Sequence, residues 1–234
     1  MKSIDVDRVA LFGLWALLIL LFGLWPRLDL WFSGLFFHPV QGFTTGPVLQ
    51  AVNDAVPWIG RAMLLLALGL VLLSWLTRAL VSRRQARRAG LLLLSLVLGL
   101  GLLVHTALKN QWGRARPHAV TYFGGPATFS SPLTPARQCR RNCSFVTGHA
   151  ATGFALIALG MLGPTRRRRQ WLLLGVSSGL LIGLLRVAMG DHFLSDVLFS
   201  LAFMWSACLL IRWAWLVRVW QRRNAARPRI QPPP

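Results

Sequence analysis

The sequence predicts an all-α membrane protein, built as a bundle of six transmembrane helices. Of its 234 residues, 55% are hydrophobic and only 14% are charged. The apolar residues form runs close to the ~20 residues that cross a ~30 Å hydrocarbon layer. Short arginine clusters separate these runs, whereas a soluble domain would show alternating or one-sided apolar patterns.

The predicted spans form a single domain over residues 1–226. They are 9–25, 58–77, 89–108, 145–164, 170–187 and 194–217. The first follows a weakly basic start with no small-residue cleavage site after it, so we interpret it as an uncleaved helix. Residues 29–43 are too short and too interrupted by Gly, His and Pro to span, and their aromatic residues suit a helix in the headgroup layer. Residues 227–234 are predicted to be a disordered cytoplasmic tail.

The distribution of arginine predicts the orientation of the bundle. The net charge is +20, with five arginines between positions 78 and 88, four between 166 and 169, and five from 218 onward. In a six-helix layout these segments share one side with the N-terminus, and the positive-inside rule assigns that side to the cytoplasm. The other side then faces the periplasm of a bacterial inner membrane. Because the arginines lie at the ends of apolar runs and not on a polar folded surface, nucleic acid is not the expected partner.

The first of three polar clusters on the periplasmic side is KNQWGRARP, which offers two cations. Lys109 and Arg116 would lie two helical turns apart, although Pro117 directs Arg116 toward an extended conformation. An ammonium group supplies a point charge, and a guanidinium presents a planar fork to phosphate oxygens. The alternative is a pair of juxtamembrane side chains that reach toward the headgroups.

The second cluster is SFVTGHA, which places a hydroxyl, a glycine and a histidine before an apolar helix. Gly148 would let backbone N–H groups approach an anion, and the helix N-terminus adds positive potential. Thr147 would supply a hydroxyl, and His149 an acid or a base. The alternative for Thr147 is a simple helix cap.

The third cluster is LLRVAMGDHFLSD, which joins the last two spans. His192 and Asp196 are four residues apart, so on one helix they would stand on the same face, one turn apart. A carboxylate bonded to one ring N–H leaves the other nitrogen free as a nucleophile or base. The alternative is that Asp196 pairs with Arg186 near a helix end.

Together the clusters predict an anion pocket with two histidines, one to attack phosphorus and one to protonate the leaving oxygen. Neither a metal nor another cofactor is expected, because the chain has no Glu and only Asp191 and Asp196 lie near the clusters. The non-enzyme hypothesis is a transporter with an anion path. It is disfavoured because the ionisable residues gather at one end of the spans.

The three clusters resemble the signature of the type 2 phosphatidic acid phosphatase (PAP2) superfamily, which is K-x6-R-P, then hydroxyl-Gly-His, then R-x5-H-x3-D. The resemblance implies a six-helix bundle of the PAP2/haloperoxidase type and a membrane lipid phosphatase that works through a phosphohistidine. By position, His192 would be the nucleophile, Asp196 would orient it, and His149 would give a proton to the leaving lipid oxygen. The residues implied in phosphate binding are Lys109, Arg116, Thr147, Gly148 and Arg186.

The expected substrate is a phospholipid or glycolipid. The segments CRRNCSFVTGHA and LDLWFSGLFFHPVQGF resemble bacterial lipid A phosphatases and their phosphotransferase relatives, which favours lipid A. A long basic outer loop suits a large anionic headgroup. Undecaprenyl diphosphate, phosphatidylglycerol phosphate and phosphate transfer to another lipid stay open as alternatives. Two positions depart from the usual family pattern, because Val146-Thr147 replaces Pro-Ser and Leu185 replaces a Ser.

Cys139 and Cys143 are predicted to form a disulfide on the periplasmic side, where such bonds persist. The bridge would stiffen the strand that leads into Thr147. A zinc site is disfavoured, because His118 and His149 are not at the spacing of a zinc finger. Two further residues, His105 and Cys208, are interpreted as packing residues.

Overall fold

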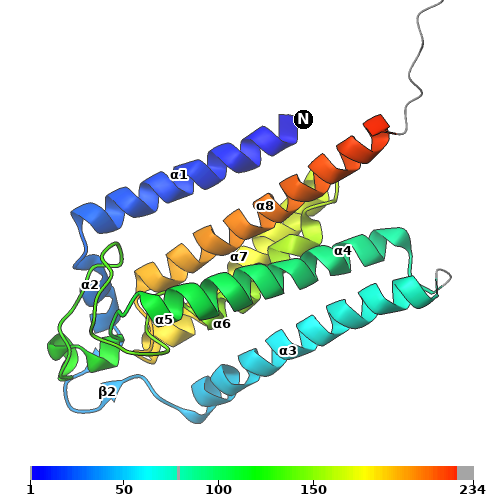
Figure 1. The fold of residues 1–234 in the computed structure, drawn as a ribbon. Coiled ribbons are helices and arrows are strands. Elements are labelled where there is room, and N and C mark those ends of the chain that lie inside the picture. The colour runs from blue at the N-terminus through cyan, green and yellow to red at the C-terminus, as the bar shows by residue number, and fades with distance from the viewer. Residues whose placement is uncertain (1, 78–79, 226–234) are drawn as a thin grey trace, which may run out of the picture.

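The long helices of the computed structural model run side by side, and the structure describes residues 2–77 and 80–225 (Figure 1). The continuous long helices are α1 (Lys2–Leu24), α3 (Pro47–Leu76), α7 (Thr165–Ala188) and α8 (Leu194–Ala225). A further long helix starts as α4 (Arg83–Leu94), continues as a π-helix (Ser95–Leu108) and ends in α5 (Lys109–Gln111). The tail predicted at 227–234 lies outside the described residues.

Among the described residues, five helices are long and apolar enough to cross a membrane. They are Val6–Leu24, Pro47–Leu76, Arg83–Gln111, Thr165–Ala188 and Leu194–Arg222. The second starts earlier than its predicted bound of 58, because Gly46-Pro47 forms its start and Pro suits the first helical turn. Polar Asn53 and Asp54 lie inside this helix, where they interrupt the apolar run on which the prediction relied.

The fourth predicted span, 145–164, is not a full-length membrane helix. It consists of α6 (Gly148–Phe154) followed by a 3-10 helix (Ala155–Gly160), a total of fewer than 18 residues. This segment packs against α7, α8, α3 and the π-helix, and Phe154, Ala155 and Ile157 have no exposed surface. Because neighbouring helices surround it, its length does not have to match the thickness of the bilayer. A bundle of six full-length spans is therefore not confirmed.

Helices α6 and α7 touch backbone to backbone, and glycine makes this possible. A Cβ atom added to Gly153 would lie 2.6 Å from the Gly179 nitrogen, and one added to Gly179 would lie 2.2 Å from the Phe154 ring. These distances leave no room for a side chain. The contact fixes α6, and with it the cluster at residues 147–149, against α7.

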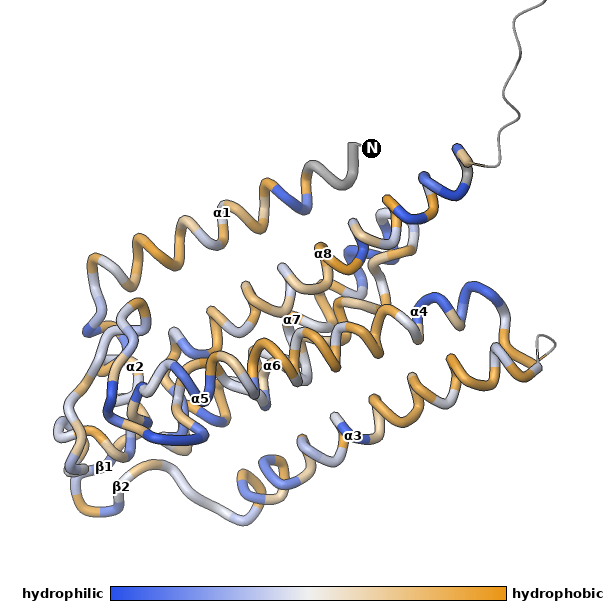
Figure 2. Tube along the Cα trace, viewed as in Figure 1, coloured by the Kyte–Doolittle hydropathy of each residue, from blue (hydrophilic) through white to orange (hydrophobic). Residues whose placement is uncertain are grey.

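The basic segments gather at one end of the bundle, which we call the arginine pole. In Figure 2 the hydrophilic start of α1, start of α4 and end of α8 lie at the same end. Ion pairs join α1, α7 and α8 near this end, because Asp7 in α1 binds Arg168 in α7 at 3.0 Å and Arg212 in α8 at 3.5 Å. The three arginine-rich segments and the start of the chain thus share one side.

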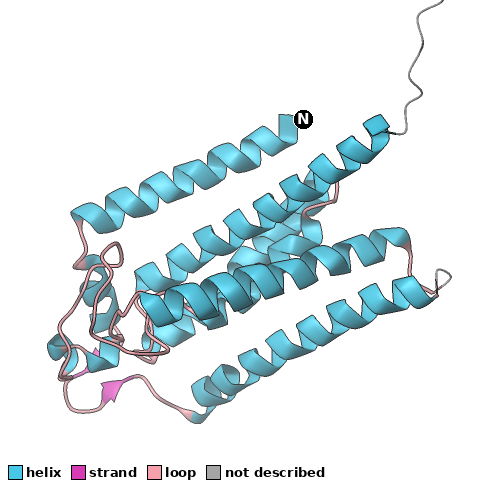
Figure 3. Ribbon diagram, viewed as in Figure 1, coloured by secondary structure: helices cyan, strands magenta, loops and turns pink. Residues whose placement is uncertain are grey.

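The opposite end, which we call the site pole, carries most of the non-helical chain (Figure 3). It includes α2 (Leu28–Gly34) and an antiparallel hairpin of β1 (Phe37–His38) and β2 (Gly42–Phe43). The headgroup-layer helix predicted within 29–43 is therefore helical only in its first part. A small second core holds this pole together and consists of Leu30, Phe43, Ala115, Val120, Phe123 and Phe193.

A chain of buried charges ties α2 to the start of α8. The Arg114 guanidinium lies 2.8 Å from Asp29 and 2.6 Å from Asp196, and all three side chains are fully buried. Ser195 completes the network, because its hydroxyl donates to Asp29 at 2.5 Å and accepts from Arg114 at 2.8 Å. The Phe193 ring lies 4.3 Å from the guanidinium. Every member of the network makes hydrogen bonds to another member. The buried charges are therefore paired, as charges removed from water have to be.

Replacing Arg114 with Leu is expected to destabilise the protein by about 3–5 kcal/mol, because both carboxylates would remain buried without a cation. The measurement is chemical denaturation in detergent micelles. Arg137→Leu serves as the control, since Arg137 is exposed in the same loop and its loss should change stability by about 0.5 kcal/mol or less. Equal unfolding midpoints for the two variants would contradict a role for the buried charges in stability.

Candidate active site

His192 lies in the turn between α7 and α8, at the site pole. Helix α8 begins two residues later at Leu194, so His192 precedes the helix and does not share a helical face with Asp196. Its Nδ1 nevertheless lies 3.7 Å from the Asp196 Oδ2, and both side chains are fully buried. This separation is longer than a hydrogen bond.

Burial sets the charge of the His192 imidazole. Loss of solvation, together with the cations Lys109 and Arg186 and against the Asp196 carboxylate, which raises it, lowers the pKa of His192 to about 3. The ring is therefore neutral at pH 7, with a lone pair on one nitrogen. A neutral imidazole is the form that can attack an electrophile.

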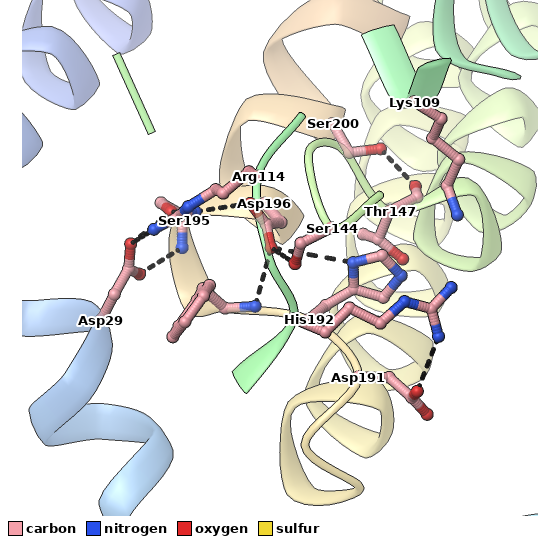
Figure 4. A network of polar contacts seen from close by, with 12 residues as sticks. Asp29, Lys109, Arg114, Ser144, Thr147, Asp191, His192, Ser195, Asp196 and Ser200 are labelled. Carbon is pink, nitrogen blue, oxygen red and sulfur yellow. Dashed lines mark hydrogen bonds and ion pairs between the residues drawn. The ribbon is translucent and has the colours of Figure 1, made fainter. Parts of the chain in front are cut away.

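The Asp196 carboxylate is held by donors from three parts of the chain (Figure 4). Oδ2 accepts from the Ser144 hydroxyl at 2.5 Å and from the Phe193 N–H at 2.8 Å. Oδ1 accepts from Arg114 at 2.6 Å. The alternative in which Asp196 pairs with Arg186 is therefore wrong, because its guanidinium partner is Arg114.

Arg186 and Arg116 share a different carboxylate. Asp191 binds Arg186 through Oδ2 at 3.0 Å and Arg116 through Oδ1 at 2.8 Å. The two guanidinium groups come from α7 and from the loop after α5, so Asp191 brings the first and third sequence clusters together. This aspartate orients the cations predicted to bind phosphate.

The two cations of the first cluster meet at Asn142. Lys109 donates from Nζ to the Asn142 side-chain oxygen at 3.0 Å, and Arg116 donates to the Asn142 carbonyl at 3.1 Å. Asn142 adopts a left-handed conformation with φ 53° inside the short loop closed by the Cys139–Cys143 disulfide. The Cys143 N–H also donates to the Lys109 carbonyl at 3.0 Å. The bridged loop thus supports the cations directly.

Thr147 stands at the N-cap position of α6, but its side chain does not cap the helix. The hydroxyl is buried and has no hydrogen-bond partner among the described residues, so the helix-cap alternative is wrong. Its carbonyl accepts from the Ser200 hydroxyl at 2.9 Å. Gly148 is packed against His105, whose ring would lie 2.7 Å from an added Cβ, in agreement with a packing role for His105.

His149 is half-buried in the first turn of α6. Its Nε2 lies 3.3 Å from the backbone carbonyl of Asn53 in α3. The imidazole interacts electrostatically with Lys109 and Arg186, the same two cations that act on His192. Residues of all three clusters therefore lie near the same two cations, and this group of side chains is the candidate pocket for a phosphate.

Several buried polar atoms of this pocket have no hydrogen-bond partner in the described part of the chain. They are Thr147 Oγ1, Arg186 Nε and both ring nitrogens of His192. Buried polar groups normally find a partner, and unpaired ones are costly. A tetrahedral oxyanion, with several acceptor oxygens, matches this arrangement of hydroxyl, guanidinium and imidazole.

Some residues around the site were not anticipated from the sequence. They are Asp29, Asn53, Arg114, Asn142 and Ser144. A signal existed for Asp29, because the chain has only six acidic residues and a carboxylate in an apolar segment needs a partner. No comparable signal marks Asn53, Asn142 or Ser144, since each contacts the site from a distant part of the chain.

Known proteins resemble this chain over most of its length. The chain is 32% identical to the lipid A 4'-phosphatase of Francisella tularensis subsp. novicida (strain U112) over 179 residues, which cover 74% of this chain and 80% of the relative. It is 28% identical to the lipid A 4'-phosphatase of Rhizobium leguminosarum over 218 residues, covering 86% and 91%. No solved structure matches the chain.

The sequence profile of the PAP2 superfamily matches residues 90–222. This range contains the three clusters that form the pocket and more than half of the chain. The chain therefore belongs to the PAP2 superfamily.

Proposed function

We propose that this protein is a metal-independent lipid phosphatase of a bacterial inner membrane, and that it removes the 4'-phosphate of lipid A at the periplasmic face. The two relatives named above are lipid A 4'-phosphatases, which supports the choice of lipid. The site lies at the pole opposite the arginine pole, and the positive-inside rule then favours the periplasm. The exposed Arg137, Arg140 and Arg141 around the bridged loop suit a large anionic headgroup.

One observation carries the proposed chemistry. A fully buried, neutral His192 lies beside Asp196 in a pocket that also holds the cations Lys109 and Arg186 and an unpaired hydroxyl. Positive groups stabilise the charge on the transferring phosphoryl group, and a neutral imidazole supplies the electron pair that attacks it. A transport site would not require a neutral nucleophile held next to a carboxylate.

In the first step, the Nε2 lone pair of His192 attacks phosphorus. Burial and the cations Arg186 and Lys109 lower the pKa of His149 to about 4, so His149 takes up a proton from solvent only when the bound phosphate offsets those two cations. The bond from phosphorus to the lipid oxygen breaks, and that oxygen takes the bond electrons and this proton from His149. Asp196 faces the opposite ring nitrogen, Nδ1, and stabilises the positive charge that develops on the ring. The distance of 3.7 Å between Nδ1 and Asp196 shortens in this scheme as charge develops, because catalytic hydrogen bonds tighten in the substrate complex.

In the second step, water attacks the phosphorus of the phosphohistidine. His149, now neutral, accepts a proton from the water, and the bond from phosphorus to His192 breaks with its electrons returning to Nε2. Inorganic phosphate leaves, and both histidines return to their starting protonation states. The phosphate oxygens are bound throughout by Lys109, Arg116, Arg186, Thr147 and the Gly148 N–H.

Replacing His192 with Ala is expected to reduce phosphate release from lipid A by at least about 10³-fold, because no other group in the pocket can form the intermediate. His38→Ala is the control, since His38 is exposed in the β1 strand and should retain full activity. Release is followed as free phosphate with purified protein in detergent. Full turnover by the His192 variant would overturn the mechanism.

Chelation is expected to leave the activity unchanged, whereas vanadate is expected to inhibit it. The carboxylates at the site, Asp191 and Asp196, already bind arginines, and vanadate can adopt the five-coordinate geometry of the attacked phosphorus. Initial rates with and without EDTA, and with increasing vanadate, provide the measurement. Loss of activity on chelation that returns with added metal would contradict the proposal.

Lipid A is expected to lose one phosphate, from the 4' position, faster than the other lipids lose theirs. The panel contains lipid A, undecaprenyl diphosphate, phosphatidate and phosphatidylglycerol phosphate, and mass spectrometry follows each product. Free phosphate is counted against phosphorylated acceptor lipid, which separates hydrolysis from phosphotransfer. Faster loss from another lipid would reassign the substrate and leave the chemistry intact.

A further inference from the structure

Asn53 in α3 contacts two residues of the pocket at once. Its backbone carbonyl lies 3.3 Å from His149 Nε2, and its side-chain oxygen accepts a hydrogen bond from Arg186 NH1. Asn53 lies outside residues 90–222, the range that matches the PAP2 superfamily. A helix beyond the family-matched region therefore touches both a candidate proton donor and a candidate phosphate ligand.

The Asn53 carbonyl is available because of Pro57. In an α-helix, the carbonyl of one residue accepts the N–H of the residue four positions later. Position 57 lies inside α3, and proline has no N–H to donate. The Asn53 carbonyl therefore has no partner from that position, and the His149 N–H takes its place.

Neighbouring contacts hold Asn53 in this position. Its side-chain N–H donates to Asp54 Oδ1 at 3.0 Å, so the amide oxygen is the atom that faces Arg186. Farther along α3, a Cβ added to Gly60 would lie 3.3 Å from the Thr152 side chain in α6. Helices α3 and α6 are thus in close contact near His149, which leaves the carbonyl little freedom to move away.

We propose that the Asn53–Pro57 turn of α3 positions the proton donor of the reaction, in that Pro57 frees the Asn53 carbonyl to hold His149 by its Nε2–H. The inference rests on the proposed function, in which His149 protonates the leaving oxygen. A carbonyl is only an acceptor, so Nε2 keeps its hydrogen and Nδ1 carries the proton that moves. In the first step that proton passes from Nδ1 to the lipid oxygen, and in the second step Nδ1 receives one from water.

Pro57→Ala tests this role, because alanine restores an N–H that competes with His149 for the Asn53 carbonyl. The rate constant kcat on lipid A is expected to fall about 10-fold, as part of the contribution of general acid catalysis is lost. KM should stay within about 2-fold of the parent value, since Arg186 and the other phosphate ligands are unchanged. The unfolding midpoint should be equal or higher, because alanine favours the helix. If Pro57 had only a structural role, a fall in kcat would be accompanied by a fall in the unfolding midpoint.

Two matched variants complete the test. Pro47→Ala makes the same change at the first residue of α3, where the residue four positions earlier lies in β2 and outside the helix, and it should leave kcat unchanged. Asn53→Ala retains the carbonyl but removes the contact with Arg186, and it should raise KM about 5-fold with a smaller effect on kcat. A fall in kcat for Pro47→Ala equal to that of Pro57→Ala would overturn the inference.

The tautomer of His149 provides a measurement that does not depend on activity. With ¹⁵N-labelled histidine and no substrate, His149 should be in the neutral Nε2–H form in the parent and a mixture of both neutral forms in Pro57→Ala. If the parent releases no phosphate, the proposed function is wrong. The ¹⁵N spectrum still tests separately whether the Asn53 carbonyl holds His149 in its Nε2–H form. If the parent is active and Pro57→Ala keeps both its kcat and the Nε2–H form, the inference alone is wrong.

Discussion

The site pole depends on one buried contact, the Arg114 guanidinium held between Asp29 and Asp196. None of these side chains reaches water, so removing Arg114 would leave two carboxylates without a cation in a medium of low dielectric constant. The contact decides where α2, the loop after α5 and the start of α8 can lie. It also occupies one oxygen of Asp196, which leaves the other to face Ser144 and His192.

The approach of the cations to His192 was readable from the places of the clusters at the ends of the predicted spans, whereas the spacing of four between His192 and Asp196 did not put them on one helical face. Lys109 and Arg186 act on His192 because each of the three lies at or beside the end of a long helix at the same pole. Their partners were not readable, since Asn142 and Asp29 reach the site through folding contacts across 33 and 85 positions. Such contacts depend on loop conformation, which local pattern does not specify.

The two errors in the helix pattern have one physical origin. Hydropathy counts apolar residues but does not distinguish a helix facing lipid from one surrounded by protein. The segment 145–164 is apolar because α7 and α8 bury it, and it can therefore be short. In contrast, α3 begins before the apolar run. Its first turns are polar because they contact the pocket, through Asn53, and do not have to face lipid. Both deviations occur where a helix serves the site.

On the proposed function, the two acidic residues of the pocket have different roles. Asp191 balances charge, and Asp196 orients His192. Asp191 binds Arg116 and Arg186 through its two oxygens and balances one of their two positive charges, so the substrate phosphate must share or displace this carboxylate to bind the same cations. Asp196 is bound by Arg114 and Ser144 and keeps its place beside His192 whatever the phosphate does. Competition at Asp191 limits how tightly a phosphate product can be held, because its release returns the two guanidinium groups to a ready partner. The pocket can thus present positive charge to the phosphoryl group during the reaction and still release the phosphate product.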